Sequence, residues 1–232
     1  MQPAAVNTPL QESASVVGEQ AYSAETLGIL DTIDPADPDT AIAALEALGE
    51  AGDASAVEAL GELFGAGARG IPRDPARACD YFEQVPAERA DAQHNVATCY
   101  YDGVGRPRDH AKARVHYARA IAAGFTQSQC ALGNMLIKGD GVDRDLAKAQ
   151  SWFERAHAHG RADAAFRVFQ TLFQRGYVSD GERASVDPGL LQDAVEWARV
   201  AAEADPDTEH RKLAGEASDA IQRIMASVKA AD

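Results

Sequence analysis

Residues 132–149 read Leu-Gly-Asn-Met-Leu-Ile-Lys-Gly-Asp-Gly-Val-Asp-Arg-Asp-Leu-Ala-Lys-Ala, and this stretch decides the fold. Apolar residues at the spacing of one helix face precede a glycine pair, Gly139 and Gly141, which suits the left-handed backbone that ends a helix. Asp145 then stands where a carboxylate caps the next helix, and Ala149 allows two helices to approach closely. The stretch therefore predicts two helices joined by a glycine turn.

The same pattern recurs along the chain with a period of 36 residues. Copies begin at Gly52, Glu88, Gly124 and Gly160, and a partial copy precedes them up to residue 51. A single helix pair cannot bury its apolar side alone, so successive pairs must stack on one another. The sequence therefore predicts an all-α solenoid of stacked helix-turn-helix repeats over residues 21–205.

Segments of different character flank and interrupt the repeats. Residues 1–20 are polar, small and proline-bearing, which is typical of a flexible N-terminal segment. Residues 206–232 are expected to form a C-terminal capping helix, because the end of a stack needs a polar outer face. The fourth copy carries extra residues between Gly176 and Gly189, and the sequence assigns this inserted loop no role.

The repeated motif resembles the Sel1-like repeat family, a relative of the tetratricopeptide repeat. The resemblance rests on residues 132–149 with Trp152-Phe-Glu-Arg-Ala and Gly160, and on Tyr100-Tyr-Asp-Gly-Val-Gly followed by Asp109-His-Ala-Lys-Ala. The second copy departs from the family pattern, since it has Glu88 and Ala97 at positions where the pattern has glycine. The resemblance implies a right-handed superhelix of helix pairs that acts as a non-catalytic scaffold or adaptor.

The resemblance also implies where such a protein works. Members of the family act in bacterial envelope signalling, in secretion, or as immunity proteins against a secreted toxin. A cysteine-rich subgroup is linked to cell-wall-type small molecules and carries a cysteine pair in each repeat. Here Cys79, Cys99 and Cys130 fall at three different repeat positions, so that subgroup is not matched.

The first helix of each repeat lines the concave face of such a superhelix, so its side away from the apolar stripe is the candidate binding surface. When the first residue of each copy is counted as position 0, that side comprises positions 3, 6, 10, 13 and 14. The candidate partner-binding residues are Asp91, His94, Thr98, Tyr101, Asp102, Gln127, Asn134, Ile137, Lys138 and Gln170. The first copy adds Ser55, Glu58 and Glu62, and the fourth adds Phe166. The alternative is that these are solvated positions that bind nothing.

The net charge of the chain limits the classes of partner that it is expected to bind. The chain has 22 Lys and Arg against 36 Asp and Glu, a net charge of −14, which repels nucleic acid and anionic membranes and favours a basic protein or peptide. No apolar run reaches the roughly 18 residues that cross a bilayer, and no signal peptide is visible. We therefore expect no membrane insertion. We expect the periplasm or secretion if the chain is a trimmed mature form, and the cytoplasm otherwise.

Few features of the sequence indicate catalysis, metal binding or cofactor binding. The sequence shows no catalytic constellation, metal site or cofactor motif, and we expect no enzyme activity. The alternative function is a small-molecule binder or hydrolase with a pocket between repeats, in which Asp91, His94 and Asp102 would converge. Cys99 is most simply a small buried hydrophobic residue. A Cys79–Cys99 disulfide remains open at this point, as do the partner and the oligomeric state.

Overall fold

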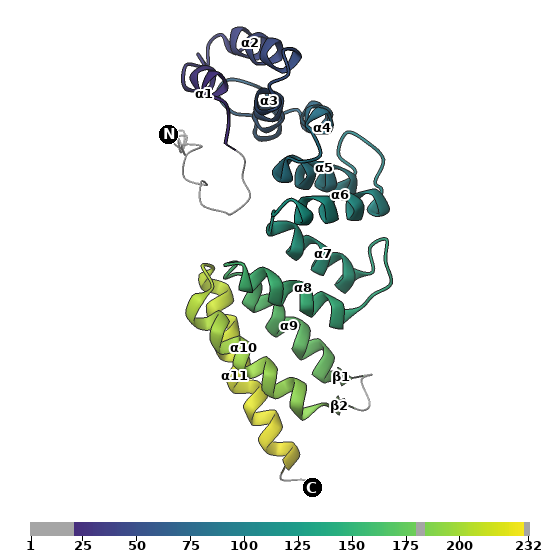
Figure 1. The fold of residues 1–232 in the computed structure, drawn as a ribbon. Helices are drawn as coiled ribbons and strands as arrows, with labels where there is room; N and C mark the ends of the chain where they lie inside the picture. Colours follow the sequence, from purple (N-terminus) through teal and green to yellow (C-terminus); the bar gives the residue numbers. More distant parts are fainter. Residues whose placement is uncertain (1–20, 180–183, 230–232) are drawn as a thin grey trace. The chain divides into compact units, whose positions relative to one another are not determined.

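The computed structural model describes residues 21–179 and 184–229, and its helices follow one another through short turns (Figure 1). The expected flexible segment at residues 1–20 lies outside the described residues. The helices are α1 (Ala24–Asp31), α2 (Pro38–Glu50), α3 (Ala54–Ala66), α4 (Pro75–Gln84), α5 (Ala90–Asp102), α6 (His110–Ala122), α7 (Gln127–Lys138), α8 (Leu146–Ala158), α9 (Ala164–Gly176), α10 (Pro188–Ala204) and α11 (Thr208–Lys229).

The helices form the expected pairs. The first helices of the four repeats are α3, α5, α7 and α9, and the second helices are α4, α6, α8 and α10. The repeat prediction is therefore confirmed as an α-solenoid of helix pairs. None of the helices in the described part of the chain has the length and apolar character that a membrane crossing requires.

The turns inside the repeats use the glycines that the sequence marks. α3, α5 and α7 each end at a glycine in the left-handed region, namely Gly67, Gly103 and Gly139, with φ of 69°, 72° and 78°. Asp145 caps α8, because its side chain accepts a hydrogen bond from the Lys148 amide. The glycine-then-aspartate signal thus sets where one helix ends and the next begins.

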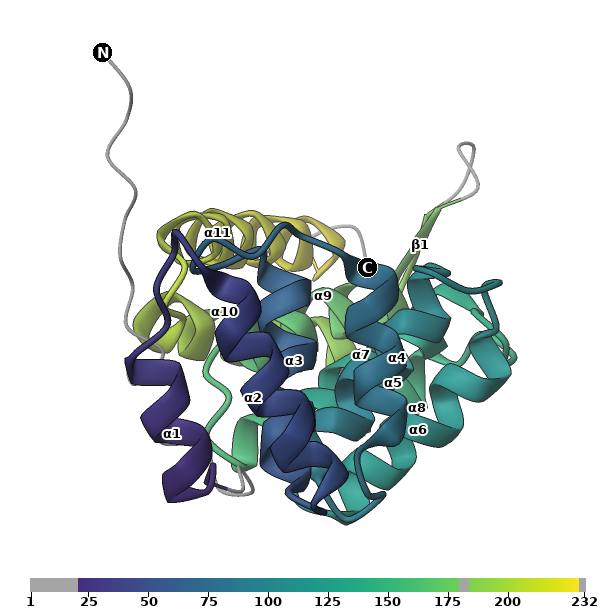
Figure 2. The same ribbon diagram turned by 90° about the horizontal axis from the view of Figure 1, so that it is seen from above.

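The chain divides into two compact units. The N-terminal unit comprises residues 21–108 and 119–125 of the described chain, and the C-terminal unit comprises residues 109–118, 126–179 and 184–229. In the N-terminal unit, α2 packs against α3 with α1 beside them (Figure 2). Its apolar core includes Leu45, Leu60, Phe64 and Phe82.

The core of the C-terminal unit lies among α8, α9, α10 and α11. Phe153, Leu172, Leu191 and Ile221 are each no more than 1% exposed. α11 packs along α10. An isolated end helix would leave the apolar side of α10 open to water, and α11 covers it.

Glycines bring the two helices of a pair together in the same way in both units. A Cβ on Gly61 would lie 2.6 Å from Cε1 of the Phe82 ring, and a Cβ on Gly133 would lie 2.6 Å from Cε1 of the Phe153 ring. Any side chain at either position would therefore collide with the ring. The phenylalanine of the second helix lies directly on the bare backbone of the first.

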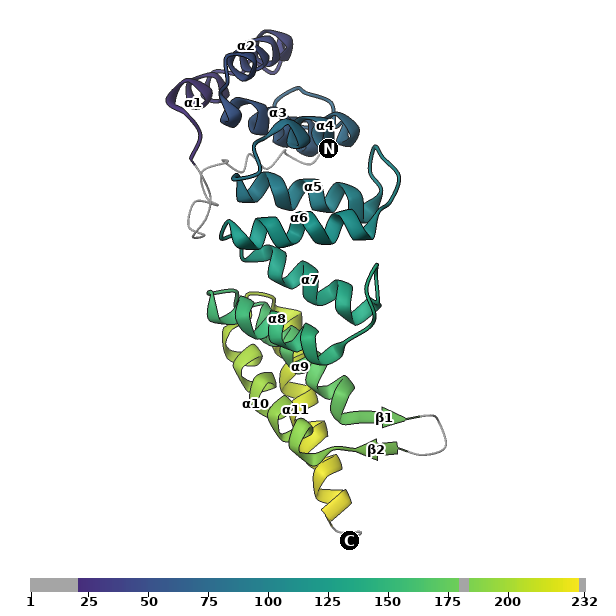
Figure 3. The same cartoon turned by 45° about the vertical axis from the view of Figure 1, so that its right-hand side comes forward.

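The extra residues of the fourth repeat contain a β-hairpin. β1 (Tyr177–Ser179) continues from α9, and antiparallel β2 (Ala184–Val186) leads into α10 (Figure 3). We expected a loop at residues 176–189, because a strand of three residues is too short to show the alternation of apolar and polar residues that marks a strand. The pairing joins Tyr177 to Val186 and Val178 to Ser185.

Candidate partner-binding surface

One side of the C-terminal half of every first helix is at least partly exposed to solvent. Positions 10, 13 and 14 of the repeat are at least partly exposed in all four copies. We call these residues the first-helix surface, and they are Glu62, Gly65, Ala66, Thr98, Tyr101, Asp102, Asn134, Ile137, Lys138, Gln170, Phe173 and Gln174. The structure therefore leaves seven of the ten candidate residues accessible in this half, and Gln127 at position 3 is exposed as well.

The N-terminal halves of the first helices are more covered than the sequence analysis expected. At position 6, Glu58 is 1% exposed and Phe166 is 4% exposed, so the expectation that they face the groove is wrong. Ser55 at position 3 is 4% exposed, so the expectation that it faces the groove is wrong as well. His94 is half-buried, with its ring centroid 4.9 Å from that of Phe125. Residues from outside each repeat pack over these positions. Such contacts cannot be inferred from the sequence of one repeat at a time.

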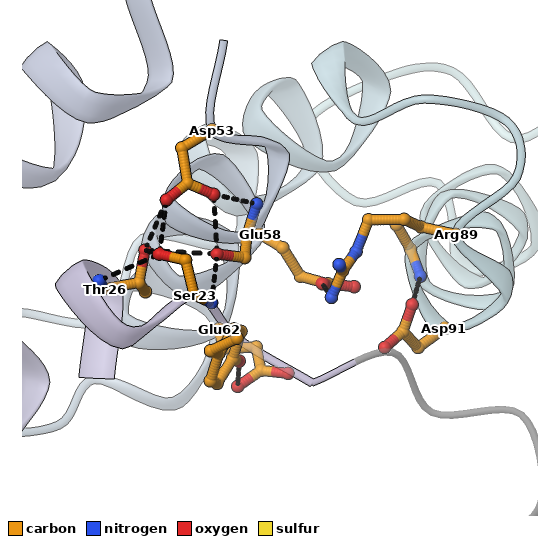
Figure 4. A network of polar contacts seen from close by, with 10 residues as sticks. Ser23, Thr26, Asp53, Glu58, Glu62, Arg89 and Asp91 are labelled. Carbon is orange, nitrogen blue, oxygen red and sulfur yellow. Dashed lines mark hydrogen bonds and ion pairs between the residues drawn. The ribbon is translucent and has the colours of Figure 1, made fainter. Parts of the chain in front are cut away.

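Glu58 forms a buried ion pair with Arg89, the residue that precedes α5 (Figure 4). Their side chains are 1% and 8% exposed. Burial raises the pKa of Glu58 to about 9, the Asp91 carboxylate adds to the rise, and the Arg89 guanidinium opposes it. The pair holds the turn before α5 against the middle of α3.

A second polar cluster fastens the start of α1 to the start of α3 (Figure 4). Asp53 accepts hydrogen bonds from the hydroxyls of Ser23, Ser55 and Thr26 at 2.5, 2.6 and 3.1 Å. Burial acts to raise the pKa of Asp53, but these hydrogen bonds outweigh it and lower the pKa to about 2. Asp53 also caps α3 through the Ser55 amide.

A cavity of about 420 Å³ opens beside these clusters in the N-terminal unit. Residues of α1, α3, α4 and α5 and their flanks line it: Tyr22, Leu30, Ala59, Gly61, Glu62, Leu63, Gly65, Ala66, Ala68, Phe82 and Asn95. The Tyr22 hydroxyl donates a hydrogen bond of 2.5 Å to Oε2 of Glu62. Burial raises the pKa of Tyr22, and the carboxylates of Glu62, Glu58 and Asp91 add to the rise.

The cavity does not use the three groups that the small-molecule alternative brought together. Asp91, His94 and Asp102 are not among the residues that line it. Asp91 is half-buried and accepts a hydrogen bond of 2.9 Å from the Ala92 amide, whereas Asp102 is exposed. Of the residues that the sequence analysis named in the first copy, Glu62 lines the cavity.

The cysteines depart from expectation. Cys79 of α4 and Cys99 of α5 form a disulfide with Cα atoms 6.1 Å apart, so Cys99 is not the buried thiol that the sequence analysis preferred. The bond joins the second helix of one repeat to the first helix of the next. Cys130 is a half-buried free thiol, and burial raises its pKa to about 11, which makes it a poor nucleophile.

Comparison with known families decides the identity of the repeats. The model of the Sel1 repeat matches residues 54–84, 90–125, 126–160 and 162–206. The chain belongs to the Sel1 repeat family. Sel1 repeats generally act as scaffolds for protein interactions, and their boundaries here coincide with the helix pairs that start at α3, α5, α7 and α9.

Solved structures show the same Sel1 repeat fold. A protective antigen of uropathogenic Escherichia coli with an SLR fold is 19% identical with a TM-score of 0.67, and the match covers 83% of this chain and 39% of that one. A Sel1 repeat protein from Oxalobacter formigenes is 21% identical with a TM-score of 0.60, covering 78% of this chain and 68% of that one. The chain thus spans about two fifths of the length of the Escherichia coli protein. A search of the curated proteins finds no match.

Proposed function

We propose that the chain is a non-catalytic adaptor that binds a protein or peptide through the first-helix surface of its Sel1 repeats. The supporting observation is the accessibility of positions 10, 13 and 14 in all four copies, while positions 8 and 9 of the same helices are buried in all four. Their side chains include carboxylates, amides, a tyrosine and a lysine. Such a mixture suits a peptide held by side-chain hydrogen bonds.

The partner of this adaptor is basic. The chain carries a net charge of −14, and Glu62 and Asp102 add carboxylates to the first-helix surface. Opposite charges accelerate encounter and salt screens them, so binding weakens as ionic strength rises. The Cys79–Cys99 disulfide supports an oxidising compartment, such as the periplasm or the extracellular space, as the place of binding.

Site-specific photo-cross-linking tests the proposed surface. A photoreactive amino acid at exposed Asp102 or Lys138 should link to one and the same partner in the native host. The matched controls are exposed positions of the second helices, Lys112 and Lys148, which should give no such product. Equal cross-linking from the second helices would remove the first-helix surface from the proposal.

A second candidate function is the binding of a small molecule in the 420 Å³ cavity. Its volume lies within the range of roughly 300–1,000 Å³ that is usual for ligand sites, and most of its lining is apolar. Tyr22 and Glu62 are the titratable side chains among the described residues of its wall, so the cavity favours a binder over a hydrolase.

A further inference from the structure

The first repeat carries a small residue beside the cavity of the N-terminal unit where the other repeats carry large ones. At position 13 the other copies have Tyr101, Ile137 and Phe173, and the last two pack against the core of the C-terminal unit. The first copy has Gly65 at this position, and Gly65 lines the cavity. The first repeat therefore leaves open a space that a side chain of its own could occupy.

The packing of the helices does not require glycine at position 65. A Cβ on Gly65 would lie 3.6 Å from the Cβ of Ala78, which is an ordinary van der Waals contact. A Cβ on Gly61 would instead collide with the Phe82 ring at 2.6 Å. Glycine also stabilises a helix less than alanine does. The consequence of Gly65 is therefore the space in the cavity, and not a closer approach of two helices.

The wall of the cavity favours an uncharged occupant. Leu30, Leu63 and Phe82 are each less than 10% exposed and give the wall apolar surface. The described residues that line the cavity include no basic side chain, so an anion would lose water without gaining a counter-ion. Glu62 is the acidic side chain among them, and it already accepts a hydrogen bond of 2.5 Å from the Tyr22 hydroxyl. A cation would therefore have to compete for a carboxylate that is already in use.

Asn95 of α5 offers the occupant a polar contact. Its side chain lines the cavity, is partly buried and makes no hydrogen bond to another residue of the described chain. An asparagine amide has two N–H donors and a carbonyl acceptor. The cavity of about 420 Å³ also exceeds the roughly 150 Å³ that accepts benzene in an engineered protein cavity. A fitting ligand is therefore larger than benzene and carries a group that donates or accepts a hydrogen bond.

We propose that this cavity binds an uncharged aromatic molecule of about two fused rings that carries one amide or hydroxyl group. The rings lie against Leu30, Leu63 and Phe82, and the amide or hydroxyl group is bound by Asn95. Aromatic rings pack favourably beside one another, which suits a ring next to Phe82. The proposal rests on the second candidate function, whose ligand it makes more specific, and the adaptor function does not depend on it.

The test uses compounds with the same ring system as probes. 2-Naphthamide is uncharged, 2-naphthoate is an anion of nearly the same shape, and 2-naphthylmethylamine is a cation at neutral pH. Each compound is titrated into the isotopically labelled full chain, and the backbone amide shifts of Gly61, Gly65 and Asn95 are followed by NMR. 2-Naphthamide should shift these amides and bind at least about tenfold more tightly than either charged compound, because a charge would lose water without gaining a partner.

A variant that fills the cavity shows whether the probe binds there. Gly65→Leu adds a side chain to the wall and suits a helix better than glycine does, so it should abolish binding of 2-naphthamide. The matched control is Gly28→Leu, at an exposed glycine of α1 whose added Cβ would have no atom within 4 Å, and it should leave binding unchanged. Circular dichroism verifies that both variants are folded. If Gly65→Leu is not, Ala66→Leu, at an exposed residue of the cavity wall, takes its place.

A second variant tests the polar contact. Asn95→Leu keeps the approximate volume of the side chain and removes its hydrogen-bonding groups, so it should weaken 2-naphthamide about two- to tenfold. Naphthalene has no polar group and should bind the original chain and the variant alike. An equal loss of both compounds would overturn the proposed role of Asn95.

The remaining outcomes each decide the proposal. Equal or tighter binding of a charged compound at the cavity would overturn it and leave the small-molecule candidate standing. No shift at the cavity residues with any compound would overturn both. Tighter binding of acetyl-Ala-Ala-Trp-Ala-Ala-amide than of 2-naphthamide would also overturn it, because the cavity would then serve a side chain of the protein partner. Cross-linking on the first-helix surface tests the adaptor function separately from all of these results.

Discussion

The first and fourth repeats fill the same position with opposite chemistry. At position 6 the first repeat has Glu58, which pairs with Arg89, and the fourth has Phe166, whose ring stacks on His210 with centroids 4.2 Å apart. Glu58 and Phe166 are 1% and 4% exposed. The packing of the helices thus requires a side chain that fills position 6, but that side chain need not be apolar. The polar solution differs in one respect: the Arg89 guanidinium keeps its charge, so removal of Glu58 leaves that charge buried without its partner.

Breaking the ion pair is the strongest way to expose that difference. Glu58→Ala should destabilise the chain by about 3–5 kcal/mol, because it leaves the Arg89 guanidinium buried without its carboxylate. Arg89→Ala should cost less, since Glu58 can take up a proton and become neutral whereas arginine cannot lose one. Urea unfolding followed by circular dichroism measures both.

A paired replacement sharpens the same comparison. The double variant Glu58→Leu with Arg89→Met should recover most of the loss, as apolar replacements of buried ion pairs do elsewhere. Phe166→Ala in the fourth repeat should instead leave a void. A change at a charged residue cannot fill that void. A double variant as unstable as Glu58→Ala alone would show that the pair has a role beyond filling space.

Removing the disulfide should have the next largest effect. The bond closes a loop between residues 20 apart, so replacing both Cys79 and Cys99 by Ala should lower stability by about 3 kcal/mol. Calorimetry under non-reducing conditions measures the change. The matched variant Cys130→Ala, in the C-terminal unit, lacks a cross-link to lose and should cost clearly less. A chain that melts unchanged without the bond would mean that packing alone holds α4 to α5.

Close helix contacts should respond alike in the two units. Ala149 of α8 and Ala78 of α4 are 0% and 3% exposed, and Phe at either position should overpack the contact and cost about 1–3 kcal/mol. Thermal melting reports the loss. Ala147→Phe, at an exposed site of the same helix as Ala149, is the control and should change little. If Ala149→Phe melts like the control, the assignment of the buried stripe on α8 is wrong.

Acid should weaken the cap of α3 and spare the other first helices. The hydrogen bonds of the folded state lower the pKa of Asp53 to about 2, below that of an aspartate in the unfolded chain, so its contribution is complete above about pH 4 and is lost as pH falls towards 2. Asp53→Asn should cost about 1 kcal/mol at neutral pH and flatten that acid-induced loss, as urea midpoints across the pH range would show.

Asp163 provides the matched control for the acid effect. It precedes α9 as Asp53 precedes α3, but its side chain makes no cap hydrogen bond and instead pairs with Arg161 at 2.8 Å. Asp163→Asn should therefore leave the cap of α3, and the acid-induced loss that comes from it, in place. Equal effects of the two variants would mean that the hydroxyl cluster around Asp53 adds nothing.

The sequence could predict whatever repeats along the chain. Helix pairs, glycine turns such as that at Gly139, and aspartate caps such as Asp145 depend on neighbours within about ten residues, and their signals reinforce one another in successive copies. The same periodicity places positions 10, 13 and 14 opposite the apolar stripe of their own helix, and the structure leaves them at least partly exposed. That a partner binds there stays a prediction.

The sequence could not predict what a residue meets from another element. Glu58 has the polarity of a solvated position, and only the fold brings Arg89, 31 positions later, against it. Cys79 and Cys99 occupy different repeat positions, so no periodic signal marks their bond. The cavity depends on Tyr22 and Leu30, which lie before the first complete repeat, where the register of the pattern is lost.

In the first and third repeats the same contact between a glycine and a ring, Gly61 with Phe82 and Gly133 with Phe153, joins the two helices of the hairpin. The ring fixes the distance between the two helices of the pair, and it does so in the same way in both repeats. Because this contact lies wholly inside one hairpin, a duplicated hairpin would keep the spacing of its own two helices, and only the junctions with its neighbours would need new side chains.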